Sequence, residues 1–359
     1  MKILVAMSGG VDSSVAAAIL RQEGYEVIGA TIRVWSPREP SGGAERYRGC
    51  FDANTVEYAR RVADKLGIPH YEVDAEGVFK RRVIAEFCQE YSRGRTPNPC
   101  ISCNRYVKFH FLMEKAREVG ADYIATGHYA RIEKSEDGDR YLLRKGVDRR
   151  KDQSYVLHRL SQEQIGYTRL PLGVFTKDRV RKLASELGLN AHGQESQDIC
   201  FIPDKDYPHF IMDSIPGVVK PGLILDREGV VLGRHQGIMF YTVGQRKRLG
   251  ISAKEPLYVT AIDPERNAII VGTKKEASSR ELIASRLNWI AIEAPEMPFK
   301  VDVKIRYFHP EAEAVIFPMN SDRVLVRFKE PQIAITPGQA VVFYREDIVL
   351  GGGIIETIT

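Results

Sequence analysis

The segment Ser8–Ser14 (SGGVDSS), which follows directly on the apolar run 3–7, constrains the fold of this chain more than any other stretch. The run 3–7 is too short for a helix and predicts a buried parallel strand. Residues 15–20 predict a helix, for which Asp12 or Ser13 is the expected N-cap. Two glycines let the backbone approach a ligand closely, and a helix N-terminus favours an anion. The segment therefore predicts a phosphate-binding loop, with an ordinary strand–turn–helix as the alternative, although it lacks the lysine of the G-x-x-x-x-G-K-[ST] loop.

Strands and helices alternate through the first 130 residues. Apolar runs predict further strands over 25–34, 71–73 and 123–126, and helical periodicity predicts helices over 54–66, 78–91 and 109–119. This alternation is typical of the α/β class, with a parallel, Rossmann-like sheet covered by helices on both faces. Ligands of such sheets bind at the carboxyl ends of the strands, where we expect Gly9, Ile32 and Gly127.

The rest of the chain has a different character. One more helix is predicted over 177–187, and residues 202–272 are rich in turns and short β-like runs. Alternating residues then predict strands over 301–307, 314–317, 323–328 and 340–344. The length of 359 residues exceeds that of one usual domain. We therefore predict an N-terminal α/β domain (1–200), a small central β-rich domain (201–280) and a C-terminal antiparallel β-barrel (281–359), for which a sandwich is the alternative.

Composition limits the environment in which the protein works. The net charge of +5 allows a nucleic-acid partner without requiring one. No run of 18 apolar residues is present, and Met1-Lys2 leads straight into the first predicted strand, so we expect neither a membrane span nor a signal peptide. These features predict a cytoplasmic protein. The five cysteines, an odd number, argue against a disulfide scaffold and favour thiol chemistry or a metal site.

Cysteines concentrate the predicted chemistry in two segments. Residues 96–104 combine two prolines with a C-x-x-C pair, Cys100 and Cys103, and predict a rigid, non-helical loop. Such a pair suits a redox couple, half of a metal site or a nucleophile with a helper, and two incidental buried cysteines are the alternative. Because the thiolate is the reactive form, we expect Arg105 and Lys108 to supply positive charge. Cys200 lies in a polar run and by itself would be interpreted as a structural cysteine.

Two stretches mix cations with aromatic and amide side chains, as RNA-binding segments do. Residues 151–155 (KDQSY) end a run of six basic residues between 140 and 151, and residues 241–249 (YTVGQRKRL) form the second stretch. A solvated charged surface is the alternative for both. His128 follows a predicted strand, where a histidine is either a base or a hydrogen-bonded turn residue. Residues 36–49 predict a mobile surface loop.

Taken together, these motifs resemble one family along nearly the whole chain. The segment Ser8–Ser14 is similar to that of the PP-loop ATP pyrophosphatases, and the ordered set SGGVDSS, TPNP, GHYA, KDQSY, the Cys200 stretch and YTVGQ is similar to the tRNA-specific 2-thiouridylases. The resemblance implies that ATP, with Mg²⁺, binds at Ala6, Met7, Ser8, Gly9, Gly10, Val11, Asp12, Ser13, Ile32 and Gly127. It implies tRNA contacts at Asn98, Pro99, Cys100, His128, Lys151, Asp152, Gln153, Arg306, Tyr307 and Gln339.

The resemblance also implies a reaction. ATP adenylates the C2 oxygen of the wobble uridine of a tRNA, and Cys200, as a persulfide loaded by a sulfur-donor or sulfur-relay protein, delivers sulfur to C2. Cys103 then assists, through a transient disulfide or by releasing hydrosulfide. The target base must leave its stack and water must be excluded, and residues 36–49 or the Cys200 segment are candidate lids.

Cys100 departs from the commoner pattern of this family, which has Asp at that position. Cys100, Cys103 and Cys200 together offer three thiolates, a set that can hold a [4Fe–4S] cluster with one open iron, so cluster-bound hydrosulfide is an alternative to the persulfide. Zinc on three cysteines would supply no sulfur-transfer chemistry. Two further alternatives are a PP-loop ATP pyrophosphatase that acts on a small molecule and a nucleotide-dependent RNA-binding module without catalysis.

Overall fold

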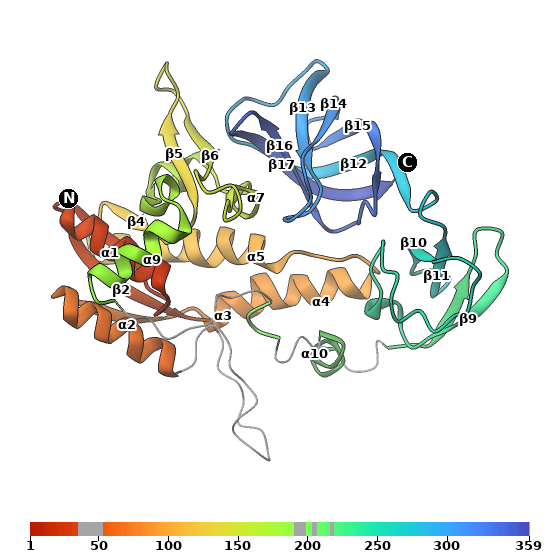
Figure 1. Cartoon of the computed structure of the whole chain (residues 1–359), viewed down its shortest axis with the longest axis horizontal. Coiled ribbons are helices and arrows are strands. Elements are labelled where there is room, and N and C mark those ends of the chain that lie inside the picture. Colours follow the sequence, from red (N-terminus) through yellow and green to blue (C-terminus); the bar gives the residue numbers. More distant parts are fainter. Residues whose placement is uncertain (35–52, 190–198, 203–206, 216–218, 359) are drawn as a thin grey trace, which may run out of the picture. The chain divides into compact units, whose positions relative to one another are not determined.

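The computed structural model describes residues 1–34, 53–189, 199–202, 207–215 and 219–358 (Figure 1). The chain divides into two compact units. The first unit comprises residues 1–84, 99–205 and 347–349, and the second comprises residues 85–98, 206–346 and 350–359. In the described part of the chain, no helix is long and apolar enough to cross a membrane.

A five-stranded sheet forms the centre of the first unit. Its strands are β1 (Lys2–Ala6), β2 (Glu26–Arg33), β3 (His70–Asp74), β4 (Tyr123–Ala125) and β7 (Thr168–Arg169), in the order β3-β2-β1-β4-β7. Each of these pairings is parallel, and Val5 of β1 lies in register with Gly29 on one side and Ala125 on the other. The parallel α/β sheet predicted from the sequence is therefore confirmed.

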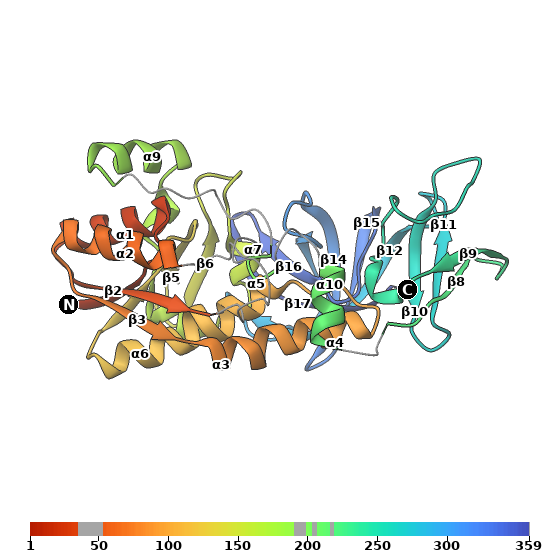
Figure 2. The same ribbon diagram turned by 90° about the horizontal axis from the view of Figure 1, so that it is seen from below.

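Helices connect and cover the strands of this sheet. They are α1 (Val11–Gln22), α2 (Ala53–Leu66), α3 (Glu76–Phe79), α5 (Pro99–Ser102), α6 (Leu112–Glu118), α7 (Ser154–Leu157), α8 (Gln162–Gly166) and α9 (Lys177–Glu186), with a 3₁₀ turn η3 (Pro171–Val174). Figure 2 shows α1, α2 and α9 on one side of β2 and β3 and α6 on the other. Ile3, Val5, Val15 and Leu20 belong to one buried cluster between β1 and α1, and burial of each such side chain contributes about 1.5–3 kcal/mol.

Two π-helical segments interrupt the helices. η1 (Lys80–Ile84) lies between α3 and α4 (Ala85–Ser92), and η2 (Cys103–Phe111) lies between α5 and α6. The predicted non-helical loop over 96–104 is wrong for residues 99–104, which are helical. Pro99 occupies the first position of α5, where a proline needs no N–H partner. Turns of π-helix are rare and frequently lie at functional sites.

A hairpin of β5 (Ala130–Lys134) and β6 (Tyr141–Lys145) follows β4. Arg131 and Arg144 of this hairpin both form ion pairs with Asp347. Ile348, the first residue of β17 (Ile348–Ile358), lies in register with Arg144. The ion pairs of Asp347 with Arg131 and Arg144 therefore attach residues 347–349 to the first unit.

The second unit contains a small four-stranded sheet. Strands β8 (Gly222–Leu225), β9 (Val231–His235), β10 (Tyr258–Asp263) and β11 (Ala268–Gly272) are ordered β10-β11-β8-β9, and β11 runs parallel to β8. Ile224, Val259, Ile269 and Val271 form its core. The same unit contains α4, α10 (Tyr207–Ser214) and the 3₁₀ turn η5 (Ile238–Phe240).

A closed antiparallel barrel completes the second unit. Strands β12 (Ser278–Trp289), β13 (Phe299–Lys304), β14 (Ala312–Asn320), β15 (Arg323–Ile333), β16 (Ala340–Arg345) and β17 are ordered β12-β15-β14-β13-β16-β17, and β17 pairs again with β12. This last pairing closes the sheet, which confirms the predicted barrel and excludes the sandwich. Gly353 permits the close approach of the two strands, because a Cβ there would lie 2.6 Å from the carbonyl oxygen of Ser285.

Candidate active site

The loop between β1 and α1 leaves the N-terminus of α1 open to a ligand. Gly9 has a φ of +70°, in the left-handed region that glycine favours, and Gly10 is the N-cap residue in an extended conformation. The expectation that Asp12 or Ser13 caps this helix is wrong, because the Ser13 hydroxyl lies inside the first turn and donates to the Gly10 carbonyl over 3.1 Å. A helix N-terminus without a side-chain cap suits a phosphate.

Glycines bring two neighbouring segments against this loop. A Cβ on Gly127, which follows β4, would lie 2.9 Å from the carbonyl carbon of Asp12 and 3.0 Å from the nitrogen of Ser13. A Cβ on Gly9 would lie 2.6 Å from the carbonyl oxygen of Thr55 in α2. The structure therefore brings Gly127 together with the loop, as the sequence predicts for a nucleotide site.

Hydrogen bonds from the sheet fix the start of the loop. The carbonyl of Met7 accepts from the hydroxyl of Thr31 in β2 over 2.8 Å. The backbone N–H of Ser8 donates to the hydroxyl of Ser13 over 3.1 Å. Ile32, the other residue predicted to contact the nucleotide, is next to Thr31 and is only 4% exposed. Ile32 thus follows Thr31, which anchors the loop, but the side chain of Ile32 itself is buried in the core.

Asp12 is the charged centre of the loop. The ammonium nitrogen of Lys177 lies 2.8 Å from each of its carboxylate oxygens, and the Tyr129 hydroxyl donates to Oδ1 over 2.7 Å. Lys177 begins α9 and is 6% exposed, and its backbone N–H donates to Asp148 over 3.0 Å. Lys177 was not predicted as a site residue. The Ser8–Ser14 segment contains no lysine, and Lys177 of α9 places a positive charge beside it. A signal existed, because the helix macrodipole disfavours a lysine in a first turn.

Two of the three predicted thiol residues lie on helical segments, and the third, Cys200, lies in a turn. Cys100 on α5 is exposed, whereas Cys103, the first residue of η2, is buried. Cys200 is half-buried, and the ring of the adjacent Phe201 lies 5.4 Å from that of Phe79 in α3, centroid to centroid. Because α3 packs against η2, one pair of helices supports the segments that carry Cys103 and Cys200.

The described cysteines form no disulfide. Cys88 is buried in α4, and burial raises the pKa of its thiol, which suits a structural role. Within the described residues, no group of three or more His, Cys, Asp or Glu side chains is placed to hold a metal ion. Cys100, Cys103 and Cys200 are thus not gathered into such a group in this structure. Cys50, the predicted mobile loop 36–49 and residues 194–198 of the Cys200 stretch lie outside the described residues.

Segment η2 connects the thiol residues with the nucleotide loop. The ring of Phe109 lies 5.7 Å from that of His128, which follows Gly127. Nδ1 of His128 lies 2.7 Å from the hydroxyl of Thr126. Burial, and to a smaller extent the charge of Lys108, lowers the pKa of His128 to about 3. Of the two interpretations of His128, the buried, neutral, hydrogen-bonded turn residue agrees with this environment.

Known proteins match this chain along its whole length. The family model of the tRNA methyl transferase HUP domain matches residues 1–204, the tRNA methyl transferase PRC-barrel domain 209–273, and the aminomethyltransferase beta-barrel domain 279–355. The tRNA-specific 2-thiouridylase MnmA 1 of Caldanaerobacter subterraneus subsp. tengcongensis is 54% identical, over 99% of this chain and 98% of the relative. The chain belongs to the tRNA-specific 2-thiouridylase family.

Two further 2-thiouridylases named MnmA are similar to the same extent. The protein of Pelotomaculum thermopropionicum is 52% identical over 99% of this chain and 97% of its own length. The protein of Clostridium botulinum (strain Alaska E43 / Type E3) is 51% identical over 99% of this chain and 98% of its own length. The resemblance that the sequence motifs carry is therefore confirmed.

Two of the tRNA contacts expected for a 2-thiouridylase are engaged inside the first unit. Asp152 is buried and accepts hydrogen bonds from the backbone of Gly146 (3.0 Å) and from the backbone and hydroxyl of Ser154 (3.1 and 2.8 Å). Gln153 exchanges two hydrogen bonds of 2.9 Å with the backbone of Tyr129. Gln153 thus holds the 151–155 segment against Tyr129, which contacts Asp12, and Asp152 joins this segment to Gly146.

The six basic residues between 140 and 151 do not share one environment. Arg144 pairs with Glu133 and Asp347, and Lys145 is buried. Arg149 and Arg150 are exposed in the turn before α7. These two arginines are the exposed members of this run, and Arg140, Arg144 and Lys151 are half-buried.

Arg306, Tyr307 and Gln339 belong to the second unit, as does Asn98, whereas Pro99 belongs to the first. The guanidinium of Arg306 donates to a main-chain carbonyl of β15 over 3.3 Å. The side-chain amide of Gln339 donates over 2.8 Å to the main-chain carbonyl two residues before Asn98. Tyr307 lies beside Phe308, with ring centroids 4.6 Å apart, and Phe308 is 88% exposed. An exposed aromatic ring of this kind suits a nucleic-acid base.

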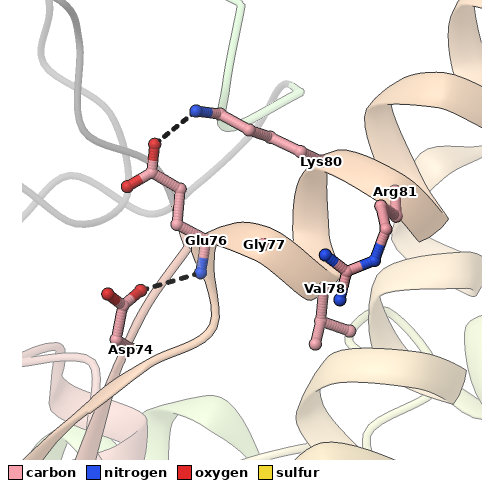
Figure 3. A pocket seen from close by; sticks show the side chains of 6 residues that line it. All are labelled: Asp74, Glu76, Gly77, Val78, Lys80 and Arg81. Atoms are coloured by element: carbon pink, nitrogen blue, oxygen red, sulfur yellow. Dashed lines mark hydrogen bonds and ion pairs between the residues drawn. The ribbon is translucent and has the colours of Figure 1, made fainter.

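An open hollow lies at the carboxyl end of β3 (Figure 3). Its lining residues are Asp74, Glu76, Gly77, Val78, Lys80 and Arg81. Lys80 pairs with Glu76, and Asp74 pairs with Arg33 over 2.8 Å, so internal ion pairs neutralise much of its charge. None of the residues expected to bind ATP, tRNA or sulfur lines this hollow, and we assign it no part in the reaction.

Proposed function

We propose that this protein catalyses the ATP-dependent exchange of the C2 oxygen of a tRNA wobble uridine for sulfur. Full-length relatives named tRNA-specific 2-thiouridylase support this activity. The observation that carries the proposal is the path of η2. This segment begins at Cys103, and its Phe109 contacts His128 beside Gly127, the glycine that packs on the nucleotide loop. One helix thus links a thiol with the expected phosphate site.

In the first step, the C2 oxygen of the uridine attacks the α-phosphorus of ATP, and pyrophosphate leaves. The N-terminus of α1 would receive the phosphates, and Lys177 would turn from Asp12 to them, which offsets their negative charge. Asp12 is the type of ligand that phosphate-bound Mg²⁺ takes, and the ion would add further positive charge. The product carries AMP on C2, a far better leaving group than the original oxygen.

In the second step, the terminal sulfur of a Cys200 persulfide attacks C2, and AMP leaves. The Cys103 thiolate then attacks the sulfur of Cys200, which forms a Cys103–Cys200 disulfide and frees 2-thiouridine. If Cys103 attacks the persulfide first, hydrosulfide is released to C2 and the same disulfide results. An external dithiol must reduce this disulfide, and a sulfur-donor protein must reload Cys200. The three cysteines are not gathered as a ligand group in this structure, and the proposed reaction therefore runs through the persulfide.

The tRNA would contact both units. We propose that the exposed arginines near Lys151 and the Arg306, Tyr307 and Gln339 region of the second unit bind it. The division into catalytic (1–200), central tRNA-contacting (201–280) and barrel (281–359) domains remains part of this proposal.

Thiolation of unmodified tRNA by the purified protein tests the proposal. The assay supplies ATP, a cysteine-desulfurase sulfur donor and a dithiol, and it measures 2-thiouridine by mass spectrometry of digested tRNA together with AMP. We expect Cys103→Ser and Cys200→Ser to abolish 2-thiouridine while tRNA-dependent release of pyrophosphate, followed in parallel, persists, and Cys88→Ser to behave as the wild type. Absence of 2-thiouridine from the complete reaction, or AMP formation that needs no tRNA, would overturn the proposal. Iron-free Cys100→Asp protein that thiolates in air would support the persulfide over the cluster.

A further inference from the structure

Two guanidinium groups lie against a single tyrosine ring next to the thiol segment. The Cζ atom of Arg82 in η1 lies 5.3 Å from the ring centroid of Tyr106 in η2, and that of Arg105 lies 5.1 Å from it. Arg82 is exposed, and Tyr106 and Arg105 are partly exposed. We call these three residues the Arg–Tyr–Arg cluster.

The charge of this cluster is not neutralised by the parts of the chain that are described. No carboxylate among them lies within ion-pair distance of Arg82 or Arg105, and the same holds for the neighbouring Arg81. Other arginines of the first unit do pair, for example Arg60 with Glu72 and Arg117 with Glu163. Two like charges beside one ring repel each other, and a bound anion would relieve this repulsion.

The position of the cluster identifies the anion. Tyr106 lies three residues after Cys103 on η2. Arg82 lies three residues after Phe79, whose ring contacts Phe201, the neighbour of Cys200. Segment η2 therefore carries Cys103 together with two residues of the cluster, and η1, which carries Arg82, directly follows α3, whose Phe79 contacts the Cys200 segment. ATP phosphates have their own place at α1, so the polyanion expected beside the thiols is the tRNA itself.

The chemistry of the cluster fits an unpaired RNA strand. Single-stranded RNA loops are recognised by stacking of bases on aromatic rings and guanidinium planes, and guanidinium groups also bind phosphates in pairs of hydrogen bonds. A wobble uridine that has left its stack leaves its neighbours in the anticodon loop unstacked as well. We propose that the Arg–Tyr–Arg cluster binds an anticodon-loop nucleotide adjacent to the target uridine. The guanidinium groups bind the phosphate of this nucleotide, and the planar side chains of the cluster stack on its base. This proposal rests on the proposed function.

The salt dependence of tRNA binding by the full-length protein tests the proposal. Loss of one phosphate contact to a single strand lowers the slope of log K against log salt by about 0.7. We expect Arg82→Gln and Arg105→Gln each to lower the slope by this amount and to weaken binding, and Tyr106→Leu to weaken binding with an unchanged slope. Arg117→Gln is the matched control, because Arg117 is also exposed beside a tyrosine ring, at 5.6 Å from Tyr167, but is paired with Glu163.

The outcomes separate this proposal from the proposed function. Unchanged tRNA affinity and slope in Arg82→Gln and Arg105→Gln would overturn the cluster as an RNA site even if the wild type thiolates tRNA. Weaker ATP binding with unchanged tRNA binding would overturn it too, in favour of a nucleotide phosphate. A lowered slope in these variants would support it even if the wild type formed no 2-thiouridine, since binding is measured without catalysis. Cys103→Ser should bind tRNA with the wild-type slope.

Discussion

Replacement of Lys177 by methionine tests the role of the Asp12–Lys177 pair. The side chain of Lys177 is 7% exposed and that of Asp12 is 34% exposed. Loss of one partner from a fully buried ion pair costs about 3–5 kcal/mol, because the other charge stays buried without compensation. Asp12 retains the Tyr129 hydroxyl and contact with water, so we expect the free energy of unfolding to fall by less, about 1–3 kcal/mol.

The effect on catalysis should be larger than the effect on stability. If Lys177 neutralises the phosphates during adenylation, its loss should lower AMP formation by about 100- to 1,000-fold, the range observed when one preorganised charge-stabilising donor is removed. The assay is release of labelled AMP from ATP in the complete thiolation reaction with saturating tRNA and sulfur donor, alongside urea unfolding of the same protein. Lys182→Met is the matched control, because Lys182 lies on the same helix α9 and is 70% exposed. Near-normal AMP formation by a destabilised Lys177→Met protein would refute the reasoning and leave Lys177 with a structural role.

Two further predictions concern stability. Burial lowers the pKa of His158 to about 3, whereas an unfolded histidine titrates near 6.5, so the unfolded chain binds the extra proton between these values and stability should fall as the pH drops from about 6.5 towards 3. His158→Gln should flatten this part of a pH series of urea unfolding midpoints, and an unchanged slope would contradict the assignment. Gly353→Ala should destabilise the barrel by about 1–3 kcal/mol, because the new Cβ would lie 2.6 Å from the carbonyl oxygen of Ser285. Urea unfolding followed by Trp fluorescence measures this change. Wild-type stability of the variant would show that β12 and β17 can move apart to accommodate the new Cβ.

Elements whose signal is local could be predicted from the sequence. The run 3–7 predicted a buried strand, and β1 spans Lys2–Ala6. The helix predicted over 177–187 is α9, Lys177–Glu186, where Thr176 accepts from the backbone of Arg179 as the N-cap. In these cases the apolar pattern and the capping residue act within a few positions, so neighbouring residues carry the information.

Features that depend on distant partners could not be predicted in this way. Lys177 is 165 positions from Asp12, and no periodicity connects the two. The glycines of β17 resemble a loop in sequence, but they are required because two backbones approach closely at Gly351 and Gly353. The two prolines before Cys103 predict a non-helical segment, but Pro99 occupies the first position of helix α5, where proline is compatible with a helix.

The pairing of β12 with β17 also bears on how the protein reaches its folded state. Its partners are distant along the chain, since Trp289 lies in register with Gly351 and Leu282 with Ile358. Loops of this length close late in folding, after local hairpins such as that of β14 and β15. Until β17 arrives, β12 presents an unpaired strand edge that can recruit an edge from another chain. Rapid synthesis at high concentration should therefore favour aggregation at this edge, and slower synthesis at lower temperature should raise the soluble yield.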